Sequence, residues 1–212
     1  YLDKKSHADP AKIREFLKGL RYPLCFLDFE TFASPIPLFD GTRPYQQVPF
    51  QYSLHRIDAE GEEAKHFEYL AQPGPDPRRE IAEKLLGEIP EGACVLVYNA
   101  AFERRVLREL GESLPGLRKR LNAVAEGMID LMEPFRRRDI YHWRMNGSYS
   151  LKSVLPVLVP EMTYDGLEIR DGAMAAGAYF TMGEISDPAE ASRLRKALLA
   201  YCRQDTLGLV RL

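Results

Sequence analysis

The stretch Tyr22–Phe32, which reads YPLCFLDFETF, limits most sharply what this chain can fold into. Its apolar run is bounded by prolines, and a run of this kind predicts a strand buried on both faces, at about residues 23–30. The run leads directly into Asp28 and Glu30. Residues i and i+2 of a strand point to the same face, so these two carboxylates should converge. Because a buried unpaired charge is costly, the pair predicts solvated acids, acids paired with arginine, or a site for Mg²⁺ or Mn²⁺, which prefer oxygen ligands.

The composition narrows the class of protein. Hydrophobic residues make up 45% of the 212 residues and charged residues 28%, which suits a soluble globular protein with one substantial core. No apolar run is long enough for a membrane span, so we expect no membrane partner. The net charge of −2 argues against a general nucleic-acid coat protein, so any phosphate binding must be local or metal-mediated. The three scattered cysteines favour neither a disulfide framework nor a zinc site, and they suit the cytoplasm, where we expect the protein.

The pattern of apolar residues predicts a single α/β domain over residues 1–212, with residues 1–20 as a lead-in segment. The chain does not begin with Met, so we expect a piece of a longer protein that has other domains. Strands followed by a strand–helix alternation and then mostly helix favour a mixed sheet flanked by helices. Besides the first strand, we expect strands at 49–58, 63–71 and 93–99, and helices at 10–20, 78–89, 101–110, 114–128, 151–158, 171–183 and 187–212.

Two further segments place acids where metal chemistry would need them. In VLVYNAAFERRVL, at residues 95–107, a buried strand gives way to a helix at Asn99, and Glu103 lies one turn inside that helix. In YCRQD, Tyr201 and Asp205 are four residues apart and therefore share one face of the last helix. Three separated segments thus each present an acid at an expected junction or on an expected helix face.

Taken in order, these segments resemble the motifs of a known enzyme family. DFET, YNAAFE and Tyr201-x-x-x-Asp205 resemble the three motifs of the DnaQ-like 3′–5′ exonucleases, the DEDD group of the ribonuclease H-like superfamily, in their tyrosine version. IDLMEPF and SYSLKSVLP resemble weaker segments of the same family, and LFDGTRPYQQVPFQYSLH resembles a bacterial family described only as a domain of unknown function. The resemblance covers about residues 20–212 and implies a ribonuclease H-like mixed β-sheet flanked by α-helices.

The resemblance implies a metal-dependent 3′–5′ exonuclease that hydrolyses phosphodiester bonds at the ends of single-stranded DNA or RNA, with two Mg²⁺ or Mn²⁺ ions. Asp28 would bridge both ions. Glu30 and Asp205 would hold the ion that generates hydroxide, and Glu103 would support the other. Tyr201 would orient the attacking water, because a phenol with a pKa of about 10 is a poor base near neutral pH. The expected catalytic residues are therefore Asp28, Glu30, Glu103, Tyr201 and Asp205.

The same resemblance assigns substrate contacts. Thr31 and Phe32 would meet the terminal nucleotide, Phe32 by stacking or wedging. Asn99 is a further candidate substrate contact, although its place favours a role in holding the strand-to-helix turn. The long Pro- and Gly-rich loop after the first strand supplies three more candidates for lining the substrate groove: Arg43, Tyr45 and Gln46.

One position departs from the family pattern. The second motif normally ends in Asp, whereas this chain has Glu103, whose longer side chain can still reach a metal directly or through water. Asp130 is a nearby acid that either compensates or is structural, like its usual counterpart in the family. The alternatives without chemistry are a surface salt bridge from Glu103 to Arg104 or Arg108, and Tyr201 as a packed aromatic.

Two other functions compete with exonuclease activity. The departure at Glu103 and the truncated start of the chain suit a catalytically weak nucleic-acid-binding module of a larger nuclease. A ribonuclease H-like endonuclease is the third hypothesis. The arginine run at 136–138 is expected to be a solvated face rather than a phosphate site. The four histidines show no ligand spacing and are expected to be structural: His7, His55, His66 and His142.

Overall fold

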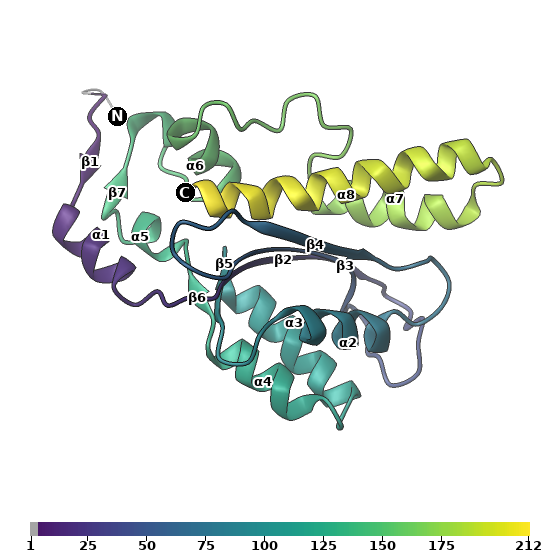
Figure 1. Cartoon of the computed structure of the whole chain (residues 1–212). Helices are drawn as coiled ribbons and strands as arrows, with labels where there is room; N and C mark the ends of the chain where they lie inside the picture. Colours follow the sequence, from purple (N-terminus) through teal and green to yellow (C-terminus); the bar gives the residue numbers. More distant parts are fainter. Residues whose placement is uncertain (1–3) are drawn as a thin grey trace.

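A computed structural model describes residues 4–212, and a five-stranded mixed sheet forms its centre (Figure 1). The strands are β2 (Leu24–Ala33), β3 (Gln47–Ile57), β4 (Lys65–Leu70), β5 (Cys94–Val97) and β6 (Ile129–Asp130). They lie in the order β4-β3-β2-β5-β6, so the strand with the DFET motif is in the middle. The β2–β3 and β3–β4 pairs are antiparallel, whereas the β2–β5 and β5–β6 pairs are parallel. The fold is therefore α/β with a mixed sheet, as expected.

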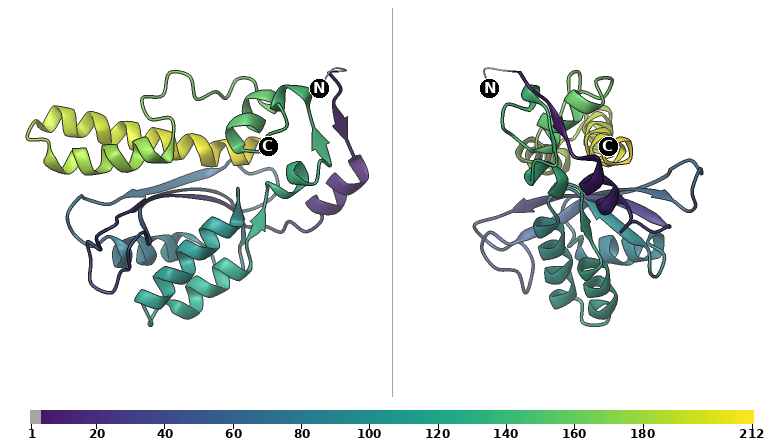
Figure 2. Two further views of the ribbon diagram at one scale, coloured as in Figure 1. Left: turned by 180° about the vertical axis from the view of Figure 1, so that it is seen from behind. Right: turned by 90° about the vertical axis from the view of Figure 1, so that its left-hand side faces the viewer.

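Helices cover both faces of this sheet (Figures 1 and 2). One face carries α2 (Arg78–Glu88), α3 (Ala100–Ser113) and α4 (Arg118–Glu126), and the other carries α7 (Gly172–Glu184) and α8 (Pro188–Arg211). Because both faces are covered, β3 is buried along most of its length.

Side-chain alternation along β2 decides which face each residue serves. Leu27 and Phe29 belong to the core shared with α2, α3 and α4, whereas Phe32 belongs to the core shared with α7 and α8. Asp28 and Glu30 have the parity of Phe32, so they point toward α8. The residues of β2 with the parity of Leu27 therefore build the core on one face, while the acids face the other layer.

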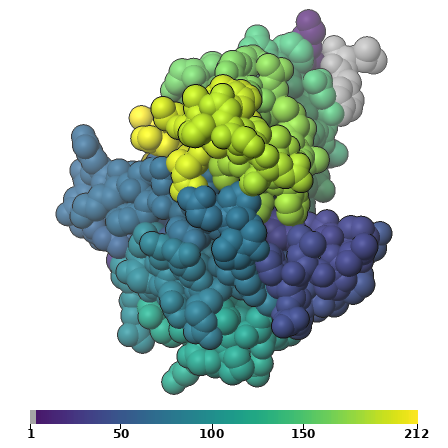
Figure 3. Space-filling model, turned by 90° about the vertical axis from the view of Figure 1, so that its right-hand side faces the viewer, coloured from purple at the N-terminus to yellow at the C-terminus, as the bar shows by residue number. Residues whose placement is uncertain are grey.

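Smaller elements complete one end of the molecule, at the left of Figure 1. They are β1 (His7–Ala8), α1 (Pro10–Leu17), α5 (Glu133–Arg136), β7 (Ile140–Tyr141), a single 3₁₀ turn (Trp143–Met145) and α6 (Leu151–Leu158). β1 pairs with β7, and α6 packs against the C-terminal part of α8, where Leu155 meets Gly208. At the other end, residues 34–46 stand out beside the α7–α8 hairpin, at the right of Figure 3. Within residues 4–212, no helix is long and apolar enough to cross a membrane.

The structure corrects several predicted boundaries. β2 does not end at the acids but continues to Ala33, because residues 31–33 pair with residues 47–49 of β3. The sequence pattern predicts this second strand only from residue 49. The register shifts between Glu30 and Thr31, so the acids lie beside an irregularity inside the strand rather than at its end. The helix expected at 114–128 begins only at Arg118.

Candidate metal centre

Four carboxylates from three elements lie close enough for their charges to interact. β2 supplies Asp28 and Glu30, and ligand atoms of these two residues and of Cys202 lie within 4.8 Å of one another. The first turn of α3 supplies Glu103 and the buried face of α8 supplies Asp205. We call these four carboxylates, those of Asp28, Glu30, Glu103 and Asp205, the acid cluster.

Burial and mutual repulsion oppose ionisation of the acid cluster. Burial raises the pKa of Asp28 well above its usual range, and the charge of Asp205 raises it further. Burial also raises the pKa of Glu30 and of Glu103, and in both cases the charge of Asp28 adds to the effect. For Asp205, burial raises the pKa to about 6. A cation bound among these groups would offset this cost, since an opposite charge favours the ionised form.

Glu103 is a buried acid rather than a surface residue. Its side chain is 2% exposed, and its Oε2 atom has no hydrogen-bond partner among residues 4–212. The predicted alternative of a salt bridge to Arg104 is wrong, because that guanidinium donates to the carbonyl oxygens of Ala125 and Met128. Arg108 is exposed, and the unpartnered oxygen of Glu103 shows that it supplies no ion pair there either. Buried carboxylate oxygens without a partner are rare in folded proteins, and they are typical of positions that hold an ion or a water molecule.

Asp130 is structural. Its Oδ1 accepts hydrogen bonds from the backbone N–H groups of Asn99 (3.0 Å) and Met132 (3.0 Å), and its Oδ2 accepts one from Ala100 (3.1 Å). These contacts hold the turn from β5 into α3, at which Asn99 adopts the left-handed conformation with φ of 78°. The carboxylate is therefore committed to the backbone, and the structure favours the structural alternative over compensation for Glu103.

Tyr201 lies among apolar residues but has a polar neighbour at its hydroxyl. The residue is 4% exposed and belongs to the core between α8 and the sheet. Its Oη accepts a hydrogen bond from Nζ of Lys152 at 3.1 Å. On the same helix, Asp205 accepts a hydrogen bond from the hydroxyl of Tyr164. Tyr201 is thus a packed aromatic, as one of the two interpretations of the sequence expected, and its hydroxyl has a polar partner.

Sequence reasoning missed three residues of this site. Lys152 lies within SYSLKSVLP, the segment noted only as a weak motif. Cys202 lies inside YCRQD, and its buried Sγ is 3.8 Å from Oδ2 of Asp28. Its place in the helix, next to Tyr201, is the signal that could have identified it. Tyr164 stands in an irregular loop with no motif around it, and no signal in the sequence marks it.

A cleft of about 430 Å³ opens beside the acid cluster. Its lining includes Glu30, Thr31, Phe32, Phe102 and Gly172. Thr31 donates its hydroxyl proton to Oε1 of Gln47 on β3 at 2.5 Å. Phe32 is 4% exposed, and its ring is packed among four other aromatic rings, so only a small part of it faces the cleft. Both predicted nucleotide contacts therefore border the cleft, but Phe32 lacks a free ring face.

The other predicted groove residues lie elsewhere. Arg43 pairs with Glu109 at 2.5 Å, and with Gln46 it borders a separate cavity of about 260 Å³ that also contains Arg78. Tyr45 is 70% exposed. Gln47, the residue after Gln46 and the first of β3, does line the cleft beside the acid cluster.

The remaining predictions concern charged surface and histidines. Arg136 and Arg137 are exposed and pair with Glu133 of α5, as expected for a solvated face. His55 and His66 stack at 4.5 Å within the sheet, and His55 is bonded to the hydroxyl of Thr206 on α8. These two histidines are structural, as expected.

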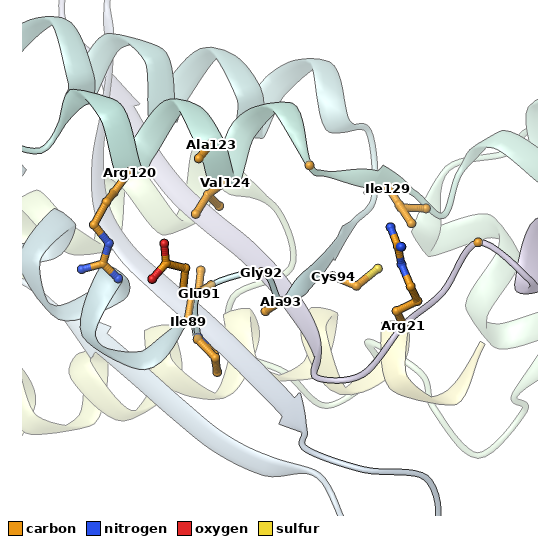
Figure 4. Close-up of a pocket in the computed structure, with 13 residues that line it drawn as sticks. Arg21, Ile89, Glu91, Gly92, Ala93, Cys94, Arg120, Ala123, Val124 and Ile129 are labelled. Atoms are coloured by element: carbon orange, nitrogen blue, oxygen red, sulfur yellow. The ribbon is translucent and has the colours of Figure 1, made fainter.

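A third cavity, of about 310 Å³, lies at the amino ends of β5 and β6, away from the acid cluster (Figure 4). Arg21 and Arg120 lie at its two ends, with Glu91 and Cys94 between them. Among its lining residues Glu91 is a lone acid, so this cavity does not repeat the chemistry of the acid cluster.

Residues 25–150 match the family described as "Domain of unknown function (DUF2779)". The chain belongs to this family. The expected resemblance to a domain of unknown function is thereby confirmed. The matched segment contains Asp28, Glu30 and Glu103 and ends before the helix that carries Tyr201 and Asp205.

The chain is also similar to the "Uncharacterized protein MG366 homolog" of Mycoplasma pneumoniae, with 23% identity over 229 residues. The alignment covers 98% of this chain and 34% of the relative, so the chain spans about a third of that protein's length. No solved structure matches this chain.

Proposed function

We propose that this domain is a metal-dependent 3′–5′ exonuclease that hydrolyses phosphodiester bonds at the ends of single-stranded DNA or RNA. One observation carries the proposal: the acids of three separate motifs lie close enough to Asp28 for their charges to interact with it, next to an open cleft. Acids that repel one another would not be expected to lie together unless they served a common site. The mixed sheet, with its DFET strand in the centre and helices on both faces, agrees with the ribonuclease H-like fold that the proposal requires.

The residues fit divalent cations. All four members of the acid cluster offer oxygen atoms, which Mg²⁺ and Mn²⁺ prefer. The unpartnered Oε2 of Glu103 leaves one ligand position available, and Asp28 interacts through its charge with each of the other three acids. Asp28 is thus the residue best placed to serve two ions. When bound, such ions offset the charge of a phosphodiester and lower the pKa of water.

The chain's own residues would position the reactants. The Tyr201 hydroxyl, held by Lys152, would orient the attacking water at the edge of the acid cluster. Thr31 and Phe32 border the cleft next to Glu30, where the terminal nucleotide would lie. Asn99 is exposed at the start of α3, and the proposal assigns it first to the turn and only second to substrate.

The principal test is hydrolysis of 5′-labelled single-stranded DNA and RNA with Mn²⁺, with Mg²⁺ and with chelator. We expect a ladder that shortens from the 3′ end with either metal, and none with chelator. Asp28→Ala and Asp205→Ala should abolish it, whereas Asp165→Asn, in an exposed loop, should not. Full activity in Asp28→Ala would overturn the proposal, and cleavage of circular strands would indicate the endonuclease instead.

The residue type at position 103 favours a second candidate, a nucleic-acid-binding module with weak catalysis. Glu103 is one methylene longer than the aspartate of the motif that it resembles, and its burial leaves little room for adjustment. Binding of single strands without hydrolysis under every metal would support this candidate. Glu103→Asp should then restore hydrolysis, whereas an active wild type should gain little from it.

A further inference from the structure

We propose that Lys152 is a positioning residue of the acid cluster, which fixes the Tyr201 hydroxyl so that this hydroxyl donates its proton toward the site. The inference rests on the proposed function, because it assigns a role in the same reaction. It starts from the contacts of Lys152, which lies on α6, outside the three motifs that supply the acids.

Four contacts fix the ammonium group of Lys152. Its Nζ donates to Oη of Tyr201 at 3.1 Å and also donates to the carbonyl oxygen of Arg170. It also lies 5.2 Å from the ring centroid of Tyr201 and 5.4 Å from that of Tyr164. The lysine side chain is exposed overall, but its charged end is held between two tyrosines that both border the acid cluster. A lysine free in solvent would have no such set of partners.

The direction of the hydrogen bond follows from the donor chemistry. An ammonium group has three donors and no acceptor, so the Tyr201 oxygen must be the acceptor in this contact. The single proton of the Tyr201 hydroxyl is then free for another acceptor, and it cannot be directed at Lys152. Tyr201 is on α8, one turn before Asp205, so the proton is available on the side of the acid cluster. Lys152 therefore determines whether Tyr201 meets a water molecule as a donor or as an acceptor.

The first test is a double-mutant cycle on hydrolysis with Lys152→Met, Tyr201→Phe and the double variant. Lys152→Met should lower kcat by roughly tenfold to a hundredfold, because misplaced positioning groups have costs of that order, and should leave KM nearly unchanged. The double variant should be no slower than Tyr201→Phe, and Lys152→Arg should recover part of the loss. Lys196→Met, at an exposed position of α8, is the matched control and should keep full activity. Additive losses in the cycle, or full activity in Lys152→Met, would overturn the proposal.

The second test needs no activity. In protein labelled with ¹³C at the ζ carbon of tyrosine, the Tyr201 resonance is assigned by its absence from Tyr201→Phe. This resonance should move in Lys152→Met and stay in place in Lys196→Met, because it reports the hydrogen bond at the hydroxyl. An unmoved resonance would overturn the proposal. If the wild type hydrolyses no strand with either metal, the proposed function is overturned, and the resonance alone decides whether Lys152 holds Tyr201.

Discussion

Asp28 is the residue at which the demands of the site oppose those of folding. Burial and the charge of Asp205 raise its pKa, so the ionised carboxylate destabilises the metal-free protein near neutral pH. We expect Asp28→Asn to raise the melting temperature in chelator by about 2–4 °C, since the amide keeps the shape and removes the charge. Calorimetry of both proteins in chelator measures this difference.

The same comparison with metal provides the control. Mn²⁺ should raise the melting temperature of the wild type, because an ion bound to the folded state stabilises it. It should have little effect on Asp28→Asn, and Asp165→Asn, which lies in an exposed loop, should respond like the wild type. A lower melting temperature for Asp28→Asn in chelator would contradict the account of the acid cluster as a site of repulsion.

For His55, burial shifts the pKa in the opposite direction. Burial lowers its pKa to about 4, below the ordinary value of 6.5, so the unfolded chain binds a proton more readily than the folded one. The contribution of His55 to stability is therefore complete above about pH 6.5 and is lost as the pH falls toward 4. Between pH 7 and pH 5, the free energy of unfolding should fall by about 1–2 kcal/mol more in the wild type than in His55→Gln. Denaturant titrations of both proteins at both pH values measure this difference. Both proteins contain the acid cluster, so its contribution cancels. Equal falls in the free energy of unfolding would contradict the prediction.

At the level of elements, the site depends on how closely α6 approaches α8. A Cβ atom at Gly208 would lie 2.6 Å from Cδ2 of Leu155, which is fully buried and cannot move aside easily. Gly208→Ala should therefore destabilise the protein by about 1–3 kcal/mol and displace the helix that carries Lys152. Gly177→Ala on α7 is the matched control, because nothing lies within 4 Å of its Cβ and alanine favours the helix. Thermal unfolding of both variants tests the contact, and equal effects would show that Gly208 is not needed for close packing.

The elements that could be predicted from the sequence are those with a strong pattern. The long amphipathic α8 begins at Pro188 after its Asp187 cap, close to the expected start, and the β3–β4 hairpin also lies where its alternation places it. The two-residue strand β6 could not be predicted, because such a short segment has no period and is defined only by its pairing with β5. The continuation of β2 to Ala33 could not be predicted for the same reason, because it depends on pairing with β3.

The site was predictable to the extent that its residues belong to local motifs. Alternation in β2 puts Asp28 and Glu30 on one face of the strand, and the i, i+4 spacing in α8 puts Asp205 on the face of Tyr201. Lys152 and Tyr164 depend on the packing of α6 and of the loop after it, which no local pattern reports. Motif spacing thus predicts the acids, and tertiary packing adds the groups that hold them.

For the molecule as a whole, the charge balance limits how it can bind a nucleic acid. The net charge is −2, and the acid cluster lies beside the cleft that would receive a phosphate. A polyanion should therefore be repelled unless divalent cations reverse the local charge. We expect single-stranded DNA or RNA to bind at least about tenfold more tightly with Ca²⁺ than with chelator, since Ca²⁺ also takes oxygen ligands. Fluorescence anisotropy of a labelled strand measures both affinities.

That experiment also separates the two candidate functions, because they differ in how the protein holds the strand. In the exonuclease, the ions link the protein to the phosphates, so Asp28→Asn should lose most of the gain that Ca²⁺ gives. In a binding module, basic and aromatic surface would hold the strand by itself, as it does in other single-strand binders. Tight binding in chelator that Asp28→Asn leaves unchanged would therefore contradict the exonuclease.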